Sequence, residues 1–189
     1  MTFGPDVRAD PTAWIHTSAQ LYGDVHVAAH ASVWPNVVIR AESQEVRIGA
    51  RTNIQDFVMI HIGGGTGTIV GEDCSITHHC TLHGCIIGDR VLIGIGSTIM
   101  DGCEVGENSI IAGHAFLKEG TIVPPNSIVM GAPGKVVRER DNAVANAMNA
   151  WMYAQNAAAY ARGDHRVWAS PAFAEAMRAE RERLTALYG

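Results

Sequence analysis

The chain has little charge and no long apolar run. Of its 189 residues, 17% are charged, and the formal net charge is -5. Nucleic-acid binding needs clustered lysine and arginine, so this composition argues against it. No apolar run approaches the roughly 18–20 residues that cross a bilayer, so we expect no membrane span. The first ten residues include Asp6 and Asp10 and lack an apolar segment. We therefore expect no signal peptide and predict a cytoplasmic protein.

The chain also lacks the cysteine spacing of a zinc ribbon or a redox motif. Its four cysteines are Cys74, Cys80, Cys85 and Cys103. Because cytosolic thiols usually stay reduced, we expect no disulfide framework. The cysteines are instead predicted to be small buried apolar side chains.

What the sequence has in abundance is an aliphatic residue at every sixth position. The repeat runs unbroken through Ile87, Ile93, Ile99, Val105, Ile111, Leu117, Val123 and Val129. Earlier segments keep the same period, from Ile15 to Ile39, from Ile48 to Ile60 and from Val70 to Leu82. The period does not match an α-helix, and the many β-branched residues and glycines also disfavour one.

A six-residue period predicts a single-stranded parallel β-helix of hexapeptide repeats. Three hexads would form one triangular coil of about 18 residues, with the aliphatic side chains inside and the coils stacked at strand spacing. We expect one such mainly β domain over residues 1–135. A C-terminal helical segment follows over residues 136–189, packing on the β-helix or on a neighbouring subunit. It should contain one helix from Arg138 to Tyr160 and a second after Ser170-Pro171.

The repeat breaks at three places, and all three carry polar residues. The first break is Arg40–Glu45, the second is the glycine loop Gly63–Gly67 after His61, and the third is a step of five residues across His83–Cys85. Insertions in repeat proteins often gather on one binding face.

Three of the nine histidines flank these breaks. His61, His78 and His83 cluster within about one and a half coils. Three neutral imidazoles with room for water would suit a catalytic zinc ion, although the alternative of ordinary surface or core histidines stays open. His79 should point away from His78, because strand side chains alternate. The remaining histidines, His16, His26, His30, His114 and His165, fit no pattern and receive no role.

A larger set of residues resembles the gamma-class carbonic anhydrase family. The set is Arg40-Ala41-Glu42, Ile48-Gly49, Asn53-Ile54-Gln55-Asp56, His61, His78 and Leu82-His83-Gly84-Cys85. The resemblance spans roughly residues 10–140. It implies a left-handed β-helix, whereas the general rule for parallel crossovers would favour the right-handed form.

The resemblance further implies a homotrimer whose metal lies between two subunits. His61 and His83 would come from one chain and His78 from its neighbour. The metal would be Zn²⁺, with Fe²⁺ or Co²⁺ as alternatives. It would lower the pKa of a bound water to about 7, so that the resulting hydroxide hydrates carbon dioxide to bicarbonate.

The same resemblance assigns supporting roles near that metal. Gln55 would orient the hydroxide or the carbon dioxide, and Asn53 would shape a turn. Arg40 and Asp56 would form an ion pair at the subunit interface, where a contact without a catalytic role is an equal alternative. Glu42 stands where the family usually has aspartate, which puts the pairing geometry in doubt.

The loop after His61 departs from the best-known active members, whose acidic loop shuttles protons. Residues 62–67 contain no acid. Hydroxide regeneration needs proton export, so weak or absent hydratase activity is one alternative, which would make the protein a metal-binding scaffold. A hexapeptide-repeat acyl- or acetyltransferase is the other.

Overall fold

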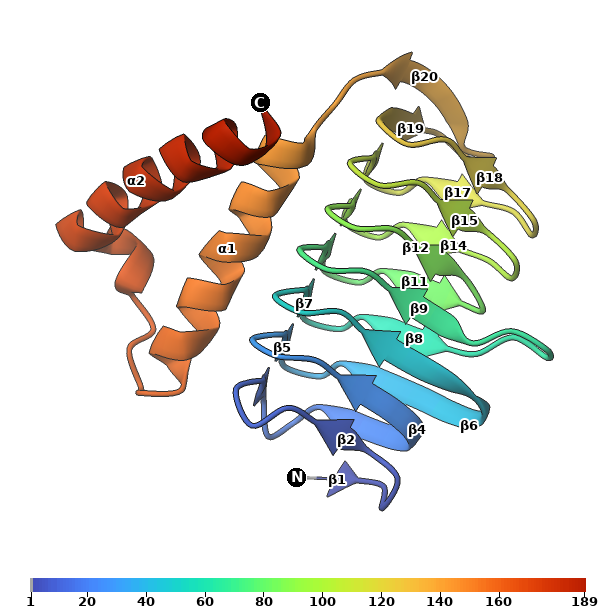
Figure 1. Cartoon of the computed structure of the whole chain (residues 1–189). Coiled ribbons are helices and arrows are strands. Elements are labelled where there is room, and N and C mark those ends of the chain that lie inside the picture. Colours follow the sequence, from blue (N-terminus) through green and yellow to red (C-terminus); the bar gives the residue numbers. More distant parts are fainter. Residues whose placement is uncertain (1) are drawn as a thin grey trace.

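The structure is a computed structural model that describes residues 2–189, and it confirms the predicted left-handed parallel β-helix with two C-terminal helices (Figure 1). Its strands are β1 (Thr2–Phe3), β2 (Arg8–Ala9), β3 (Trp14–Ile15), β4 (Gln20–Val27), β5 (Ser32–Val33), β6 (Val38–Ile48), β7 (Asn53–Ile54), β8 (Met59–His61), β9 (Thr68–Val70), β10 (Ser75–Ile76), β11 (Thr81–His83), β12 (Ile86–Ile87), β13 (Leu92–Ile93), β14 (Thr98–Ile99), β15 (Glu104–Val105), β16 (Ile110–Ile111), β17 (Phe116–Leu117), β18 (Ile122–Val123), β19 (Ser127–Met130) and β20 (Lys135–Glu139).

The coils form a prism with three faces. The helix face consists of β3, β5, β7, β10, β13, β16 and β19. The histidine face consists of the first halves of β4 and β6 followed by β8, β11, β14 and β17. The outer face consists of β2, the second halves of β4 and β6, and then β9, β12, β15 and β18. Strands β4 and β6 bend from the histidine face onto the outer face, which joins these two faces in one sheet.

The aliphatic residues of the six-residue repeat fill the prism. Ile39, Ile60, Leu82, Ile99 and Leu117 pair in register along the histidine face, and all are fully buried. Burying one such side chain contributes about 1.5–3 kcal/mol relative to leaving it in water. The four cysteines are also buried and unpaired, as predicted.

All three breaks in the repeat lie at the same corner of the prism, between the histidine face and the outer face. We call this corner the His61 vertex. Arg40 pairs with His61 and His61 with His83 in neighbouring coils, so the polar segments that follow these three residues are stacked. The opposite corner of the histidine face, where the chain arrives from the helix face, is called the His78 vertex.

The helical elements are α1 (Ala143–Tyr160), a short 3-10 turn η1 (Val167–Ala169) and α2 (Pro171–Tyr188), and Ser170 caps α2 as predicted. Helix α1 lies along the helix face, and α2 packs on the outside of α1 (Figure 1). The predicted start of the first helix at Arg138 was wrong. Residues up to Glu139 form β20, which pairs antiparallel with β19, because the last coil leaves the edge of β19 free to bond. The division into domains at residue 135 stays a prediction.

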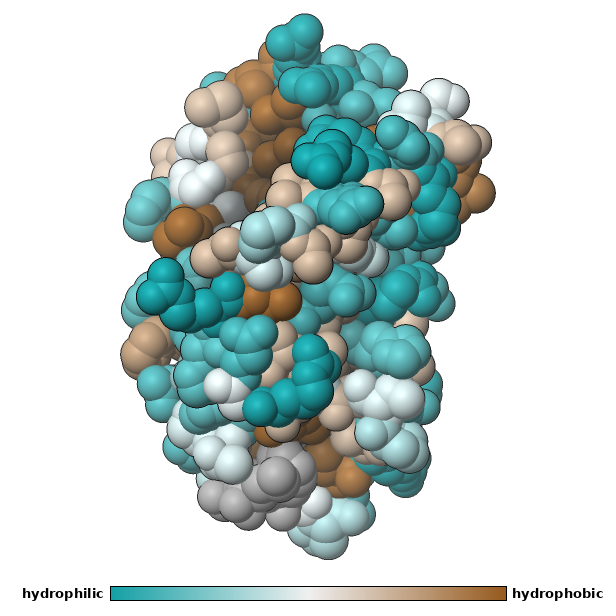
Figure 2. All heavy atoms as spheres, turned by 90° about the vertical axis from the view of Figure 1, so that its left-hand side faces the viewer, coloured by the Kyte–Doolittle hydropathy of each residue, from teal (hydrophilic) through white to brown (hydrophobic). Residues whose placement is uncertain are grey.

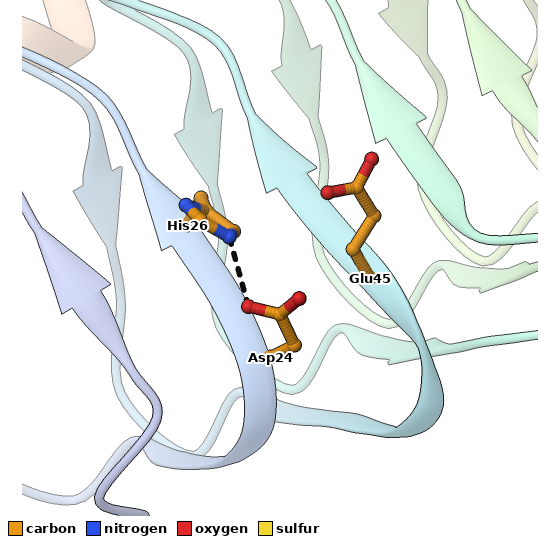
Figure 3. A group of neighbouring side chains, drawn as sticks. All are labelled: Asp24, His26 and Glu45. Atoms are coloured by element: carbon orange, nitrogen blue, oxygen red, sulfur yellow. Dashed lines mark hydrogen bonds and ion pairs between the residues drawn. The ribbon is translucent and has the colours of Figure 1, made fainter.

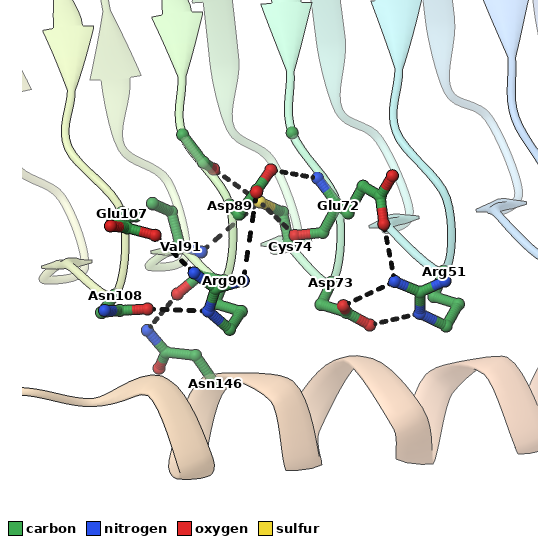
Figure 4. A network of polar contacts seen from close by, with 12 residues as sticks. Arg51, Glu72, Asp73, Cys74, Asp89, Arg90, Val91, Glu107, Asn108 and Asn146 are labelled. Atoms are coloured by element: carbon green, nitrogen blue, oxygen red, sulfur yellow. Dashed lines mark hydrogen bonds and ion pairs between the residues drawn. The ribbon is translucent and has the colours of Figure 1, made fainter. Parts of the chain in front are cut away.

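Helix α1 is fixed to the prism by buried asparagines. The Asn146 side-chain amide donates to the carbonyls of Arg90 and Ser109, at 2.7 and 3.0 Å. Arg90 in turn belongs to a row of ion pairs along the corner beneath α1, together with the pair of Arg51 and Asp73 (Figure 4). Figure 2 views the side that carries the helices, which is largely hydrophilic with apolar patches above and below. No helix among residues 2–189 is long and apolar enough to cross a bilayer.

Candidate metal centre

Two of the predicted metal ligands lie side by side at the His61 vertex. His61 ends β8 and His83 ends β11, and the two residues are direct partners in the parallel ladder. The Nδ1 atom of His61 lies 3.1 Å from the Nε2 atom of His83, and their rings are inclined at 64°. Both side chains are partly exposed. The ladder thus brings two imidazole nitrogens together at the surface.

Asp101 orients His83. Its Oδ1 atom lies 2.6 Å from the His83 Nδ1 atom, one coil further along the prism. A carboxylate at neutral pH only accepts hydrogen bonds, so in the neutral form of His83 the proton is on Nδ1 and the lone pair is on Nε2. Carboxylates that hold a histidine in this way are a common feature of metal sites. Asp101 was not predicted from the sequence, although its spacing of 18 residues from His83, one full coil, could have identified it.

The Asp101 carboxylate occupies space that two glycines leave free. A Cβ atom on Gly84 would lie 2.3 Å from the Asp101 Oδ1 atom, and one on Gly63 would lie 2.6 Å from it. Gly84 also has a positive φ of 56°, a conformation that favours glycine. The glycine loop therefore packs directly against the group that orients His83.

Glu42 connects His61 to Arg40. One carboxylate oxygen lies 3.0 Å from His61 Nε2, and the other accepts a hydrogen bond from Arg40 Nη1 at 2.6 Å. Desolvation alone would raise the pKa of Glu42, but hydrogen bonds from its own backbone and from His61, together with the charge of Arg40, lower it below its ordinary value. Glu42 is therefore an ionised acceptor beside His61.

His78, the third predicted ligand, lies at the His78 vertex, in the turn after β10. Its Nδ1 atom is 3.1 Å from the Oδ2 atom of Asp56. His78 thus has an orienting carboxylate, as His83 does. The neighbouring His79 has a positive φ and stacks on Phe57, with ring centroids 4.9 Å apart.

Gln55 is buried under α1 and is held by a chain of hydrogen bonds. Its side-chain amide donates to Asn53 Oδ1 at 2.8 Å, and the Asn53 amide donates to Ser75 Oγ at 2.9 Å. Ser75 donates to Asn149 of α1 at 2.7 Å. Asn53 therefore lies in a strand and positions Gln55, and the expectation that it shapes a turn was wrong. Its side chain bonds to the next coil because it faces the neighbouring strand β10.

Helix α1 also brings Tyr153 near the His78 vertex. Burial raises the pKa of Tyr153, and the charge of Asp56 raises it further. The Tyr153 ring packs edge-on against Trp34, with centroids 5.6 Å apart. Helix α1 thus places a phenol close enough to Asp56, the acid beside His78, to feel its charge.

The pair of His61 and His83 suits a divalent metal ion. Tetrahedral nitrogen ligands at about 2.0–2.1 Å from zinc are roughly 3.3 Å apart, close to the 3.1 Å seen here. Without a cation, one of the two imidazoles would have to donate from both of its nitrogens, because each ring also faces a carboxylate. A cation between the two imidazoles would take the place of the proton that they otherwise share.

The predicted site residues therefore form two separate groups on one chain. Arg40, Glu42, His61 and His83 gather at the His61 vertex, whereas Gln55, Asp56 and His78 gather at the His78 vertex. Within the chain Arg40 pairs with Glu42 and Asp56 pairs with His78, so the expected pairing of Arg40 with Asp56 stays a prediction about neighbouring subunits.

Known proteins that are similar to this chain share its hexapeptide repeat and its fold. A family model described as bacterial transferase hexapeptide (six repeats) matches residues 84–119. A Bacillus cereus protein described provisionally as an acetyltransferase has a solved structure with a TM-score of 0.77 and 32% identity, covering 82% of this chain and 91% of that one.

Relatives among curated proteins include named carbonic anhydrases. The protein YrdA of Escherichia coli is 45% identical over 94 residues, 46% of this chain and 51% of YrdA, so the match spans about half of that relative. "Gamma carbonic anhydrase 1, mitochondrial" of Arabidopsis thaliana is 37% identical over 98 residues, 49% of this chain and 36% of the relative. "Probable carbonic anhydrase" of Methanocaldococcus jannaschii is 50% identical over 125 residues, 66% of this chain and 79% of the relative. This chain therefore belongs to the gamma-class carbonic anhydrase family of hexapeptide-repeat proteins.

Proposed function

We propose that the protein is a metal-dependent carbonic anhydrase that works as a homotrimer. The observation that carries the proposal is the division of the site, with His61 and His83 at one edge of the histidine face and His78 at the other edge. If three copies turn this face toward a common axis, each His61 vertex meets the His78 vertex of a neighbour. Three imidazoles then converge, two from one subunit and one from the next.

The surface of the histidine face supports this packing. Its outward ladder carries no charge and consists of Val38, Met59, Thr81, Thr98 and Phe116. Phe57 and Ile95, at the His78 vertex, are 52% and 50% exposed. The corresponding ladder of the outer face is mixed, because the charged or polar Arg8, His26, Arg47 and Glu104 share it with Ile69, Ile86 and Ile122. An uncharged ladder bordered by exposed apolar side chains suits a contact between subunits.

The three histidines would hold Zn²⁺, with Fe²⁺ or Co²⁺ as alternatives. A divalent ion held by three imidazoles supplies a hydroxide nucleophile near neutral pH. Asp101 keeps the lone pair of His83 Nε2 available to the ion, and Asp56 holds the ring of His78. Gln55 orients the carbon dioxide or the nucleophile from beneath α1. Arg40 would reach Asp56 of the neighbouring subunit.

We expect proton export to limit the rate of carbon dioxide hydration. Loop residues 62–67 carry no acid, and Glu42 is already bonded to His61 and Arg40. Slow hydratase activity that increases with buffer concentration follows from this arrangement. The cytoplasmic location expected from the composition stays a prediction.

The test is stopped-flow hydration of carbon dioxide by Zn²⁺- and Co²⁺-loaded protein. Activity should disappear in His83→Ala and in His78→Ala, because each removes one ligand of the same centre. Activity that survives either change would overturn the proposal.

An acyltransferase is the second candidate, because the Bacillus cereus neighbour is described provisionally as an acetyltransferase. Acyl transfer by a histidine base needs no metal. Acetyl-CoA turnover that persists in chelator-treated protein would favour this second candidate over carbonic anhydrase.

A further inference from the structure

A second group of possible metal ligands lies where β4 and β6 fall out of register. Gly23 pairs with Ala41 and Val25 pairs with Val46, so Asp24 alone lies opposite four residues of β6, Glu42–Glu45. Gly23 has a φ of 82°, and a Cβ atom there would lie 1.9 Å from the Ala41 carbonyl oxygen. Only glycine fits at this irregularity. Bulges of this kind redirect side chains, often beside functional sites.

The irregularity brings together one histidine and two carboxylates (Figure 3). The Nε2 atom of His26 lies 2.9 Å from Asp24 Oδ1, and Glu45 approaches from the neighbouring strand. One ligand atom from each residue lies within 4.8 Å of the others. All three side chains are partly buried. The distances allow one small cation to contact all three after modest rotamer changes.

We propose that Asp24, His26 and Glu45 form a second site for a divalent first-row transition ion. One imidazole and two carboxylates are ligands that Zn²⁺, Mn²⁺, Co²⁺ and Ni²⁺ accept. The mixed nitrogen and oxygen donors disfavour Cu(I), which prefers sulfur. Because Asp24 is about half exposed, water completes the coordination. The ion would tie β4 to β6 across the bulge.

Two arginines currently balance the carboxylates. Arg8 Nη1 lies 3.9 Å from Asp24 Oδ1 and 3.5 Å from His26 Nε2, and Arg47 Nη2 lies 2.7 Å from Glu45 Oε2. The Arg8 side chain is 69% exposed, so it can move away when an ion binds. Arg8 therefore competes with the ion, and its positive charge lowers the affinity of the site.

The second site is separate from the histidine centre. The segment Glu42–Glu45 has a glutamate at each end, and these glutamates serve different clusters. Glu42 contacts His61, whereas Glu45 approaches Asp24 and His26. The second site therefore does not depend on the proposed carbonic anhydrase function. The effects of substitutions at the second site and at the histidine centre can be measured independently.

The test uses the full chain carrying His83→Ala, which removes the histidine centre. Co²⁺ binding is measured by equilibrium dialysis and by the visible absorption of the bound ion. We expect one Co²⁺ per chain, with affinity lowered more than about tenfold by Asp24→Asn and by His26→Gln. Arg8→Ala should tighten binding several-fold, since it removes a competing charge.

Glu104→Gln is the matched control, because Glu104 is an exposed acid in β15 on the same outer face and lies outside the group. This control should bind Co²⁺ like its parent, and thermal melting should show that each variant is folded. Absence of Co²⁺ binding in both the His83→Ala protein and its Arg8→Ala derivative would overturn the proposal. Binding that is unchanged by His26→Gln would overturn it as well.

Discussion

Asp101 lies one coil beyond His83, and its carboxylate accepts a hydrogen bond from the His83 ring at 2.6 Å. This contact fixes which nitrogen of His83 carries the proton and leaves Nε2 facing His61. Replacing Asp101 with asparagine should lower metal affinity at the histidine centre by about 10–100-fold, the usual effect of losing such a partner. Competition with a chelator of known affinity measures the change.

Glu119→Gln is the matched control for Asp101→Asn. Glu119 is an exposed acid in the next coil at the same vertex, and it touches neither His83 nor His61. The control should keep the affinity of the parent protein. Equal affinities for the Asp101→Asn and parent proteins would contradict the orienting role of Asp101.

The uncharged outward ladder of the histidine face predicts a specific effect on assembly. Met59 lies in the middle of that ladder. We expect Met59→Lys to convert the proposed trimer to monomers, because three buried ammonium groups would face one another around the axis. Light scattering measures the mass. Ile69→Lys, on the outer face of the same coil, should stay trimeric, and dissociation of both variants would argue against this choice of interface.

The glycine loop has room for the acid that it lacks. A Cβ atom on Gly64 would meet nothing within 4 Å. We therefore expect Gly64→Glu to fold normally and to raise kcat for hydration several-fold in weak buffer, because a carboxylate can relay protons. Stopped-flow assays at low and high buffer concentration test this. Gly64→Gln has similar size and cannot relay protons, so an equal gain with glutamine would point to another cause.

Buried thiols predict a loss of stability in alkali. Burial raises the pKa of Cys74 and of Cys85 from 9.0 to about 12. The neutral thiol is thus favoured in the folded state, and this stabilisation is complete below pH 9.0. It decreases as the pH rises toward 12, because the unfolded chain ionises first. Urea denaturation between pH 8 and 11 measures the trend, and Cys74→Ala should flatten it relative to the parent. A parent whose stability does not fall over this range would contradict the assignment.

The six-residue repeat was enough to predict the β-helix, because each face of a coil contributes one aliphatic residue that points inward. Ile60, Leu82 and Ile99 occupy the expected positions. The strand β20 was missed because Lys135–Glu139 lies outside the repeat and gains its structure only from pairing with β19. Tertiary pairing, and not the local sequence pattern, determines the strand conformation of that segment.

The candidate site was predictable in its residue types and less so in its contacts. His61 and His83 stood out because they flank breaks in the repeat, and His78 stood out because it lies close to them in the sequence. Asp101 did not, because its role depends on the stacking of coils, which places it beside His83. The group of Asp24, His26 and Glu45 was also hidden, since it forms only through the bulge at Gly23.

Complementation between inactive subunits tests the shared metal centre most directly. Proteins carrying His78→Ala and His83→Ala are each prepared in an Asp24→Asn background, which removes the proposed second site. The two are then unfolded together and refolded as a mixture, and bound Co²⁺ is measured. Each variant alone should bind no ion at the histidine centre. Random mixed trimers should recover about one quarter of the sites, where His61 and His83 of one subunit meet His78 of another. A mixture that binds no more Co²⁺ than its separate components would contradict a centre shared between subunits.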